Sequence, residues 1–249
     1  MTARNAALGH AGSLADTETR RVLKVCGATT LDDIELLAAA GADLVGLWHG
    51  VSGGRANLAS EELAVLAAAA KATRRLQPVL VTFIKDAGVL RDVVQRTGIR
   101  WVQLHAYQTP AMVRALRAAV PGELTIVKVL HLHAGRCLER SLIRSYERAG
   151  TDLFLLDNVT GDGRIGSTGQ QLCGSGVVDL FPALSRPFLL AGGISAYNRV
   201  DYDPVARHPL FFGIDVDTAA RDDQGRLRSA IVSGITRGWR TTWYHEEAA

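Results

Sequence analysis

The chain contains the stretch Ala149-Gly-Thr-Asp-Leu-Phe-Leu-Leu-Asp157, and a matching stretch, Ala40-Gly-Ala-Asp-Leu-Val-Gly-Leu-Trp48, stands about a hundred residues earlier. In each, a glycine follows a segment with helical character, and an aspartate then precedes a run of apolar residues. Glycine is the usual helix stop, and a short apolar run of this kind is typical of a buried strand. Both stretches therefore predict a turn from a helix into a strand.

The same alternation of strand and helix extends along most of the chain. The expected strands are Arg21–Cys26, Asp43–Trp48, Val79–Phe83, Trp101–His105, Leu124–Leu130, Leu153–Asp157, Phe188–Ala191 and Leu210–Val216. The expected helices are Leu31–Ala40, Ser60–Thr73, Gly88–Gln95, Pro110–Val120, Arg136–Ala149, Val178–Leu184, Ala196–Tyr202 and Arg226–Gly238. Eight strand-helix units predict a parallel sheet, and a chain of this length favours its closure into a single (β/α)8 TIM barrel over a doubly wound open sheet.

Composition sets the limits of the domain. With 47% apolar and 21% charged residues, the 249-residue chain can build one substantial core, which we place at residues 21–249. Residues 1–20 are rich in alanine, glycine and threonine and lack the apolar segment of a secretory signal, so we expect a short disordered arm there.

Charge and cysteine content exclude several classes of function. The net charge is only +3 and the arginines are scattered, so we expect no nucleic-acid partner; no apolar run is long enough to cross a membrane. Three cysteines, Cys26, Cys137 and Cys173, are an odd number without metal-ligand spacing. This pattern indicates reduced thiols in a cytoplasmic protein. The oligomeric state does not follow from the sequence.

The ends of the expected strands carry the candidate functional residues. In such barrels the chemistry lies at the carboxyl ends of the strands, where the sequence places Cys26, His49, His105, His131, Asp157, the pair Gly192-Gly193, and Asp215. A thiol and a carboxyl group on one rim can act as base and acid, so Cys26 and Asp157 are the candidate catalytic pair. The alternatives are an inert core thiol and an aspartate that only caps a loop.

Several other segments carry weaker signals. The Gly192-Gly193 turn can present backbone N–H groups to an anion, and Arg55 can grip a carboxylate or remain solvated. The loop over residues 161–169 is either a lid or an ordinary surface loop. A metal site formed by His49, His105, His131 and His133 is disfavoured, because no matching acidic ligands accompany these residues. We expect them to line the mouth or lie on the surface.

A series of motifs then resembles one enzyme family. The motifs are Lys24-Val-Cys-Gly27 with Thr30, Gly41-Ala-Asp-Leu-Val-Gly46, Val102-Gln-Leu-His105, Leu155-Leu-Asp-Asn158, Gly166-Ser-Thr-Gly169, Leu190-Ala-Gly-Gly-Ile194 with Asn198, and Gly213-Ile-Asp-Val216. In this order they resemble phosphoribosylanthranilate isomerase over about residues 21 to 240.

The resemblance implies an Amadori rearrangement of an N-aryl ribosylamine phosphate, an aldose-ketose isomerisation in tryptophan biosynthesis. It implies that Cys26 is the general base and Asp157 the general acid, that Arg55 holds the anthranilate carboxylate, and that Asp215 contacts the amine. No cofactor or metal is expected. The substrate contacts expected at the positions that correspond to the family's site are Arg55, His105, Gly169, Gly192, Gly193, Asp215, Asp217 and Thr218.

The loop after the last strand departs from the family. Where the family has Val-Ser-Ser-Gly, this chain has Val216-Asp-Thr-Ala219, so Asp217 adds a negative charge where a phosphate is expected. Either Arg221 offsets this charge or Asp217 points away. The departure therefore leaves three interpretations open. The protein is an isomerase for the family's standard substrate, a paralogous isomerase for a related aminosugar, or a barrel that binds a sugar phosphate without catalysis.

Overall fold

The computed structural model describes residues 21–161, 165, 166 and 170–240. The arm expected at residues 1–20 lies outside the described residues, as does Gly169. The strands are β1 (Val22–Cys26), β2 (Leu44–Trp48), β3 (Gln77–Thr82), β4 (Trp101–Leu104), β5 (Thr125–His133), β6 (Arg136–Cys137), β7 (Leu153–Asn158), β8 (Phe188–Leu190) and β9 (Phe211–Val216). The α-helices are α1 (Leu31–Ala39), α2 (Ser60–Ala72), α3 (Ala87–Thr97), α4 (Pro110–Ala119), α5 (Ile143–Ala149), α6 (Gly174–Val178), α7 (Asp203–Ala206) and α8 (Ser229–Arg240).

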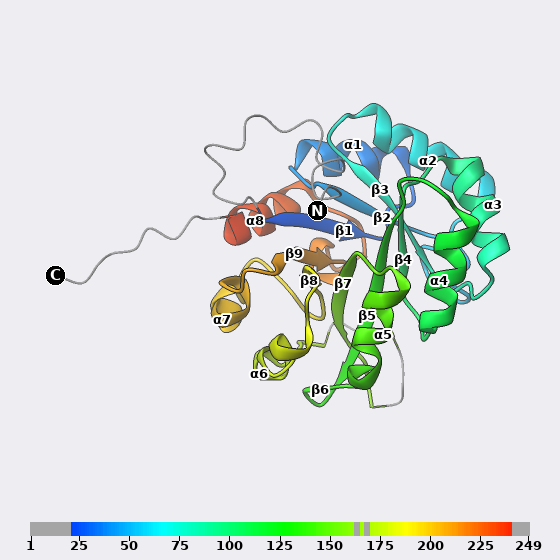
Figure 1. Cartoon of the computed structure of the whole chain (residues 1–249). Helices are drawn as coiled ribbons and strands as arrows, with labels where there is room; N and C mark the ends of the chain where they lie inside the picture. The colour runs from blue at the N-terminus through cyan, green and yellow to red at the C-terminus, as the bar shows by residue number, and fades with distance from the viewer. Residues whose placement is uncertain (1–20, 162–164, 167–169, 241–249) are drawn as a thin grey trace, which may run out of the picture.

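The eight parallel strands close into a barrel. Their order is β4-β3-β2-β1-β9-β8-β7-β5, and β4 also pairs with β5, so the sheet has no open edge among these strands. Figure 1 shows the helices on the outside of the barrel and the N-terminal β1 beside the C-terminal β9. The expected (β/α)8 barrel is therefore confirmed.

The helices begin and end where the local chemistry dictates. Thr30 accepts a hydrogen bond from the N–H of Asp33, whose carboxylate bonds back to the N–H of Thr30, so a capping box starts α1. Thr109 caps α4 ahead of Pro110, and α5 ends at Gly150, whose φ of 106° is left-handed. The Ala149-Gly150 turn thus leads from helix to strand as the sequence indicates.

Three expected helices are wrong in their bounds. The segment expected as a helix from Arg136 begins instead with β6, because β5 runs on to His133 and turns back at Ala134 and Gly135, both with positive φ. A short 3-10 helix, η1 (Arg140–Leu142), then leads into α5.

The next two helices are short and broken rather than continuous. The segment expected at Val178–Leu184 is the end of α6 followed by η2 (Phe181–Ala183), and the one expected at Ala196–Tyr202 is η3 (Arg199–Tyr202) followed by α7. Pro182 and Pro204 stand in the first turns of η2 and α7, because proline suits a helix start and not its interior.

Two apolar layers hold the barrel. A large outer cluster, including Leu37, Leu63 and Val113, packs the helices against the strands. A smaller cluster fills the interior at the amino ends of the strands and includes Val127, Leu153 and Leu189. Near the carboxyl ends a third, smaller apolar cluster, which includes Trp48 and Val81, borders buried polar side chains such as Asp215, and the candidate site lies there.

Gly213 lies at the seam where β1 and β9 pair. A Cβ at this position would lie 2.0 Å from the carbonyl oxygen of Val22, and the φ of Gly213 is 155°. We expect Gly213→Ala to reduce the free energy of unfolding by roughly 3 kcal/mol, because the two strands must separate locally to admit the methyl group. Urea unfolding would measure the change.

The matched control is Gly234→Ala in α8, where an added Cβ meets nothing within 4 Å. Here alanine should raise the stability by about 1 kcal/mol through helix propensity. Equal effects of the two substitutions would show that the seam does not restrict Gly213.

Candidate active site

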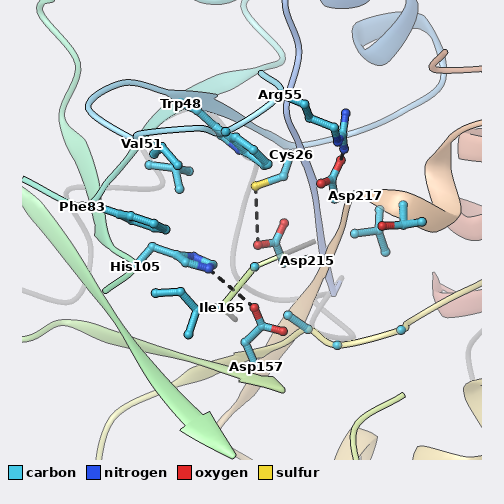
Figure 2. A pocket seen from close by; sticks show the side chains of 18 of the residues that line it. Cys26, Trp48, Val51, Arg55, Phe83, His105, Asp157, Ile165, Asp215 and Asp217 are labelled. Carbon is cyan, nitrogen blue, oxygen red and sulfur yellow. Dashed lines mark hydrogen bonds and ion pairs between the residues drawn. The ribbon is translucent and has the colours of Figure 1, made fainter. Parts of the chain in front are cut away.

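A cavity of about 580 Å³ opens at the carboxyl ends of the strands. Figure 2 shows the side chains that converge on it. The expected site residues found in its wall are Cys26, Arg55, His105, Asp157, Gly192, Gly193, Asp215, Asp217 and Thr218. The thiol and the carboxyl group proposed as base and acid therefore share one cavity.

Cys26 ends β1 and is 6% exposed. Its sulfur has space because the neighbouring residue in β2 is Gly46, where a Cβ would lie only 2.4 Å from Sγ. Burial and the charge of Asp215 raise the pKa of the Cys26 thiol to about 12, although Lys24 opposes the shift. The resting form is therefore the thiol.

Lys24 is the main site residue that the sequence analysis did not single out for a role. Its ammonium is buried, and Nζ lies 2.7 Å from Cys26 Sγ and 2.7 Å from Asp215 Oδ2. Burial acts to lower the pKa of Lys24, but Asp215 and Cys26 outweigh it, so the pKa lies above its ordinary value. The available signal was a charged residue in an apolar strand, two positions before Cys26 and hence on the same face.

Asp157 ends the apolar run of β7 and faces His105, the residue that directly follows β4. Burial, and then the charge of Asp215, raise the pKa of Asp157 to about 7, while an N–H from Asn158 partly opposes the shift. A carboxyl group in this state keeps a large share of its proton at neutral pH, as a general acid must.

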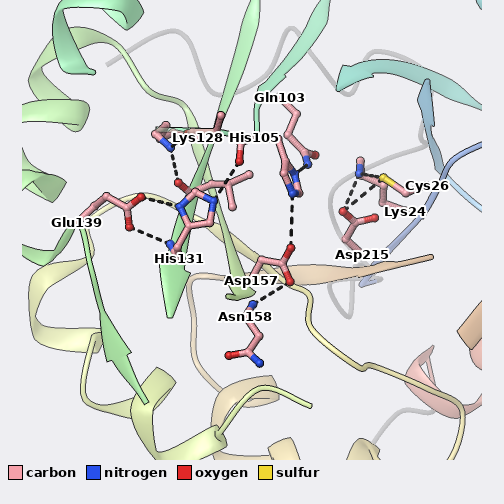
Figure 3. Close-up of polar contacts among 12 residues, drawn as sticks. Lys24, Cys26, Gln103, His105, Lys128, His131, Glu139, Asp157, Asn158 and Asp215 are labelled. Atoms are coloured by element: carbon pink, nitrogen blue, oxygen red, sulfur yellow. Dashed lines mark hydrogen bonds and ion pairs between the residues drawn. The ribbon is translucent and has the colours of Figure 1, made fainter. Parts of the chain in front are cut away.

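His105 is held in one neutral form. The side-chain amide of Gln103 donates to Nδ1 of His105 over 2.8 Å, which leaves the ring proton on Nε2. That Nε2 lies 3.7 Å from Oδ2 of Asp157 (Figure 3). Burial and the nearby His131 lower the pKa of His105 well below its ordinary value, so the ring is neutral.

Two arginines bind Asp217. Arg55 reaches its Oδ1 from the loop after β2, and Nε of Arg221 lies 3.0 Å from the same oxygen. Of the two alternatives for Asp217, the structure thus shows the one in which Arg221 offsets its charge. Arg55 offsets it as well. In this state Arg55 binds a carboxylate of its own chain rather than standing free to receive one from a ligand.

Gly192 and Gly193 adopt positive φ values of 79° and 65°. A Cβ on Gly193 would lie 2.7 Å from the Cα of Gln171, so only glycine fits this close approach. Thr218 begins the 3-10 helix η4 (Thr218–Ala220) and lines the same cavity. The loops after β8 and β9 therefore both reach the space where a phosphate would be held.

The expectation that His131 lies at the mouth or on the surface is wrong. His131 is fully buried, with Nδ1 2.6 Å from Oε1 of Glu139 and Nε2 3.0 Å from the carbonyl oxygen of His105. The β5–β6 hairpin brings Glu139 to this position, and no pattern in the sequence predicts this hairpin. Within residues 21–161, 165, 166 and 170–240, no three His, Cys, Asp or Glu residues are grouped to hold a metal ion.

Three buried polar atoms of the cavity residues lack a hydrogen-bond partner within the described part of the chain: Trp48 Nε1, His105 Nε2 and Asp215 Oδ1. Buried polar groups are normally paired, so these atoms are suited to bind a polar ligand.

No described helix has the length and apolar character needed to cross a membrane.

The barrel and this mouth define the class of the protein: a (β/α)8 barrel with a cysteine and several carboxyl groups in one cavity at the carboxyl ends of its strands. The family model for N-(5'phosphoribosyl)anthranilate (PRA) isomerase matches residues 23–225. The chain therefore belongs to the N-(5'-phosphoribosyl)anthranilate isomerase family.

Individual relatives agree with this assignment. N-(5'-phosphoribosyl)anthranilate isomerase 2 of Methanosarcina mazei is 30% identical over 208 residues, which cover 82% of this chain and 87% of the relative. The isomerase structure from Thermus thermophilus has a TM-score of 0.71 at 18% identity, with coverage of 87% and 97%. The structure from Thermotoga maritima has a TM-score of 0.69 at 20% identity, with coverage of 88% and 98%. At such identities the solved structures support the fold alone.

The raised pKa of Asp157 has a consequence for stability. Between about pH 4 and about pH 7, the unfolded chain has lost this proton while the folded chain keeps it, so stability falls as the pH rises, by roughly 1.4 kcal/mol per unit at most. Asp157→Asn removes this titration. The variant should therefore be more stable than the parent at pH 8, by an amount that shrinks as the pH falls towards 4, in urea unfolding at several pH values.

A stability difference that stays constant over this range would show that Asp157 is ionised in the folded protein. Asp92→Asn is the control, since Asp92 is 58% exposed and its substitution should give no such pH dependence.

Proposed function

We propose that this chain catalyses the Amadori rearrangement of N-(5'-phosphoribosyl)anthranilate, the aldose-ketose isomerisation of tryptophan biosynthesis. Family membership supports the reaction, and one solved relative is a phosphoribosyl anthranilate isomerase in complex with reduced 1-(o-carboxyphenylamino)-1-deoxyribulose 5-phosphate. The observation that carries the proposal is that a carboxyl group with a pKa near 7 and a cysteine line one cavity of about 580 Å³.

The proposed mechanism needs two proton transfers. Asp157, protonated in the resting state, gives its proton to the ring oxygen of the sugar, and the ring opens to an iminium ion. Cys26 then removes the proton from C2, and the resulting enolamine tautomerises to the ketone. Each general acid or base contributes about 10²- to 10⁴-fold to the rate. The reaction requires no metal or organic cofactor.

The remaining contacts follow from the wall of the cavity. We assign the phosphate to the N–H groups of Gly192 and Gly193, with Thr218 beside them, and the substrate amine to the unpaired Oδ1 of Asp215. Nε2 of His105 lies 3.7 Å from Oδ2 of Asp157 and has no hydrogen-bond partner among the described residues, so we assign its N–H to the substrate beside Asp157. Gly169 stays a predicted substrate contact.

We also place the reaction in the cytoplasm. Cys26, Cys137 and Cys173 are all free thiols, which is the state expected in a reducing compartment. The division into an arm at residues 1–20 and a barrel at residues 21–249 stays a prediction.

The test is a fluorescence assay of turnover with freshly made phosphoribosylanthranilate. Cys26→Ser and Asp157→Asn should each lower kcat by about 10³-fold or more, because each removes one proton transfer. Cys173→Ser and Asp92→Asn are matched controls on exposed residues outside the cavity and should keep the parental rate. Turnover of either active-site variant near the parental rate would rule out its role.

A second candidate, a paralogous isomerase for a related aminosugar, is favoured by one observation. Asp217 occupies Arg55, which would otherwise receive the anthranilate carboxylate, and adds a negative charge near the phosphate position. A substrate without that carboxylate would leave the Arg55–Asp217 pair intact.

Asp217→Ser separates the two substrates. If phosphoribosylanthranilate is the substrate, the variant should bind reduced 1-(o-carboxyphenylamino)-1-deoxyribulose 5-phosphate about fivefold more tightly, because Arg55 is freed and a like charge is removed. Calorimetry would measure Kd, with exposed Asp223→Ser as the control. If Asp217→Ser leaves the Kd of this compound unchanged and phosphoribosylanthranilate is not turned over, the aminosugar is favoured as the substrate.

A further inference from the structure

Cys26 must lose its own proton before it can act as a base. In the resting state its pKa is raised to about 12, with burial the largest cause and Asp215 the next. A thiolate formed beside an ionised Asp215, with Sγ and Oδ2 3.7 Å apart, would bring two negative charges together in a buried site. The chain therefore needs an acceptor for the thiol proton and a positive charge beside the sulfur.

Both groups are present at the seam of the barrel. Lys24 and Cys26 alternate along β1 and so face the same side, and Lys24 pairs in register with Asp215 of β9. One ammonium thus contacts the sulfur and the carboxylate at 2.7 Å each (Figure 3). The thiol donates to the same Oδ2 of Asp215.

We propose that Lys24 is a positioning residue for the reaction: its buried ammonium stabilises the thiolate of Cys26 after the thiol proton has passed to Asp215. This inference rests on the proposed function.

The proton balance is complete within the three residues. The S–H bond of Cys26 breaks and an O–H bond forms on Asp215, so the cluster goes from ammonium, thiol and carboxylate to ammonium, thiolate and carboxylic acid. Its net charge does not change. The thiolate then takes the C2 proton of the substrate, and Asp215 loses its extra proton to solvent as Asp157 regains one. Burial raises the pKa of Asp215, which makes it a better acceptor, while Lys24 opposes that shift.

The other charged groups around Cys26 do not replace Lys24. Asp217, after β9, is an anion that further raises the thiol pKa, and Nη2 of Arg221 bonds the carbonyl oxygens of Cys26 and Gly27 rather than the sulfur. Across the cavity, Asp157 is an acid and His105 is neutral. Arg55 is bound to Asp217. Among the described residues, Lys24 is the cation that contacts Sγ.

The thiolate can be followed without substrate, through the pH dependence of alkylation by iodoacetamide. The parent for this experiment carries Cys137→Ser and Cys173→Ser, because exposed Cys173 has a lowered pKa, caused first by its hydrogen bond with Ser175, and would react first. The apparent midpoint is obtained from alkylation rates at about pH 8 to 10, where the rate is proportional to the thiolate fraction. In that background Lys24→Met should raise the apparent midpoint of Cys26 alkylation by about one pH unit or more, which is seen as an alkylation rate about tenfold or more lower at a given pH. It should also lower kcat by about 100-fold while KM changes less than about threefold.

Two further variants test the sign and the specificity of the effect. Lys24→Arg keeps the positive charge and should restore the midpoint to near the parental value. Lys128→Met removes another fully buried lysine, whose Nζ bonds the carbonyl oxygens of Ala106 and Val129, and should leave the midpoint unchanged.

If Lys24→Met does not fold, a second pair of variants still tests the proposal. Lys24→Met leaves Asp215 buried without its cation, so the double variant Lys24→Met/Asp215→Asn, which removes both charges, is compared with Asp215→Asn alone. The proposal expects the double variant to have the higher midpoint. Equal midpoints in that pair, or a folded Lys24→Met with the parental midpoint, would overturn it.

Failure of the proposed function gives a different result. Absence of turnover in the parent with phosphoribosylanthranilate contradicts the assigned substrate, whereas the alkylation midpoints test Lys24 whatever the substrate.

Discussion

The pairing of β1 with β9 is the constraint on which the rest of the structure depends. It joins the first and last strands of the barrel in the register Val22 to Gly213 and Lys24 to Asp215. Without it the sheet would be open, and Asp215 would not meet Cys26. Gly213 permits the strands to approach, and the buried ion pair sits two residues further along the same seam. Closure of the barrel therefore also brings Lys24, Cys26 and Asp215 into contact.

The strands were predictable from the sequence because each is a short apolar run between turn residues, and all eight were found within a few residues of their expected bounds. Three of the four α-helical segments expected after β5 were not, because glycine and proline at Gly135, Pro182 and Pro204 break the segments in ways that depend on tertiary packing. Strand-end residues such as Cys26 and Asp157 were predictable because parallel strands end on one rim. The contacts of Lys24, Gln103 and Glu139 depend on strand register and on a hairpin, neither of which leaves a periodic pattern.

The mouth of the barrel concentrates carboxyl groups in a buried space. Asp157, Asp215 and Asp217 all line one cavity. Burial, together with a neighbouring carboxylate, raises the pKa of both Asp157 and Asp215. The cations are distributed unequally: Lys24 contacts Asp215, and Arg55 and Arg221 bind Asp217. Asp157 instead faces the neutral His105 and accepts the N–H of Asn158. This asymmetry makes one carboxyl group an acid at neutral pH and leaves another ionised beside its lysine.

The protonated resting state of Cys26 also affects how readily its sulfur is oxidised. Peroxides attack the thiolate far more readily than the thiol, and Cys26 is buried with its pKa raised to about 12. Cys173 is exposed, and hydrogen bonds from Ser175 and Gly176 lower its pKa. We therefore expect sulfenic acid to form at Cys173, outside the cavity, before it forms at Cys26.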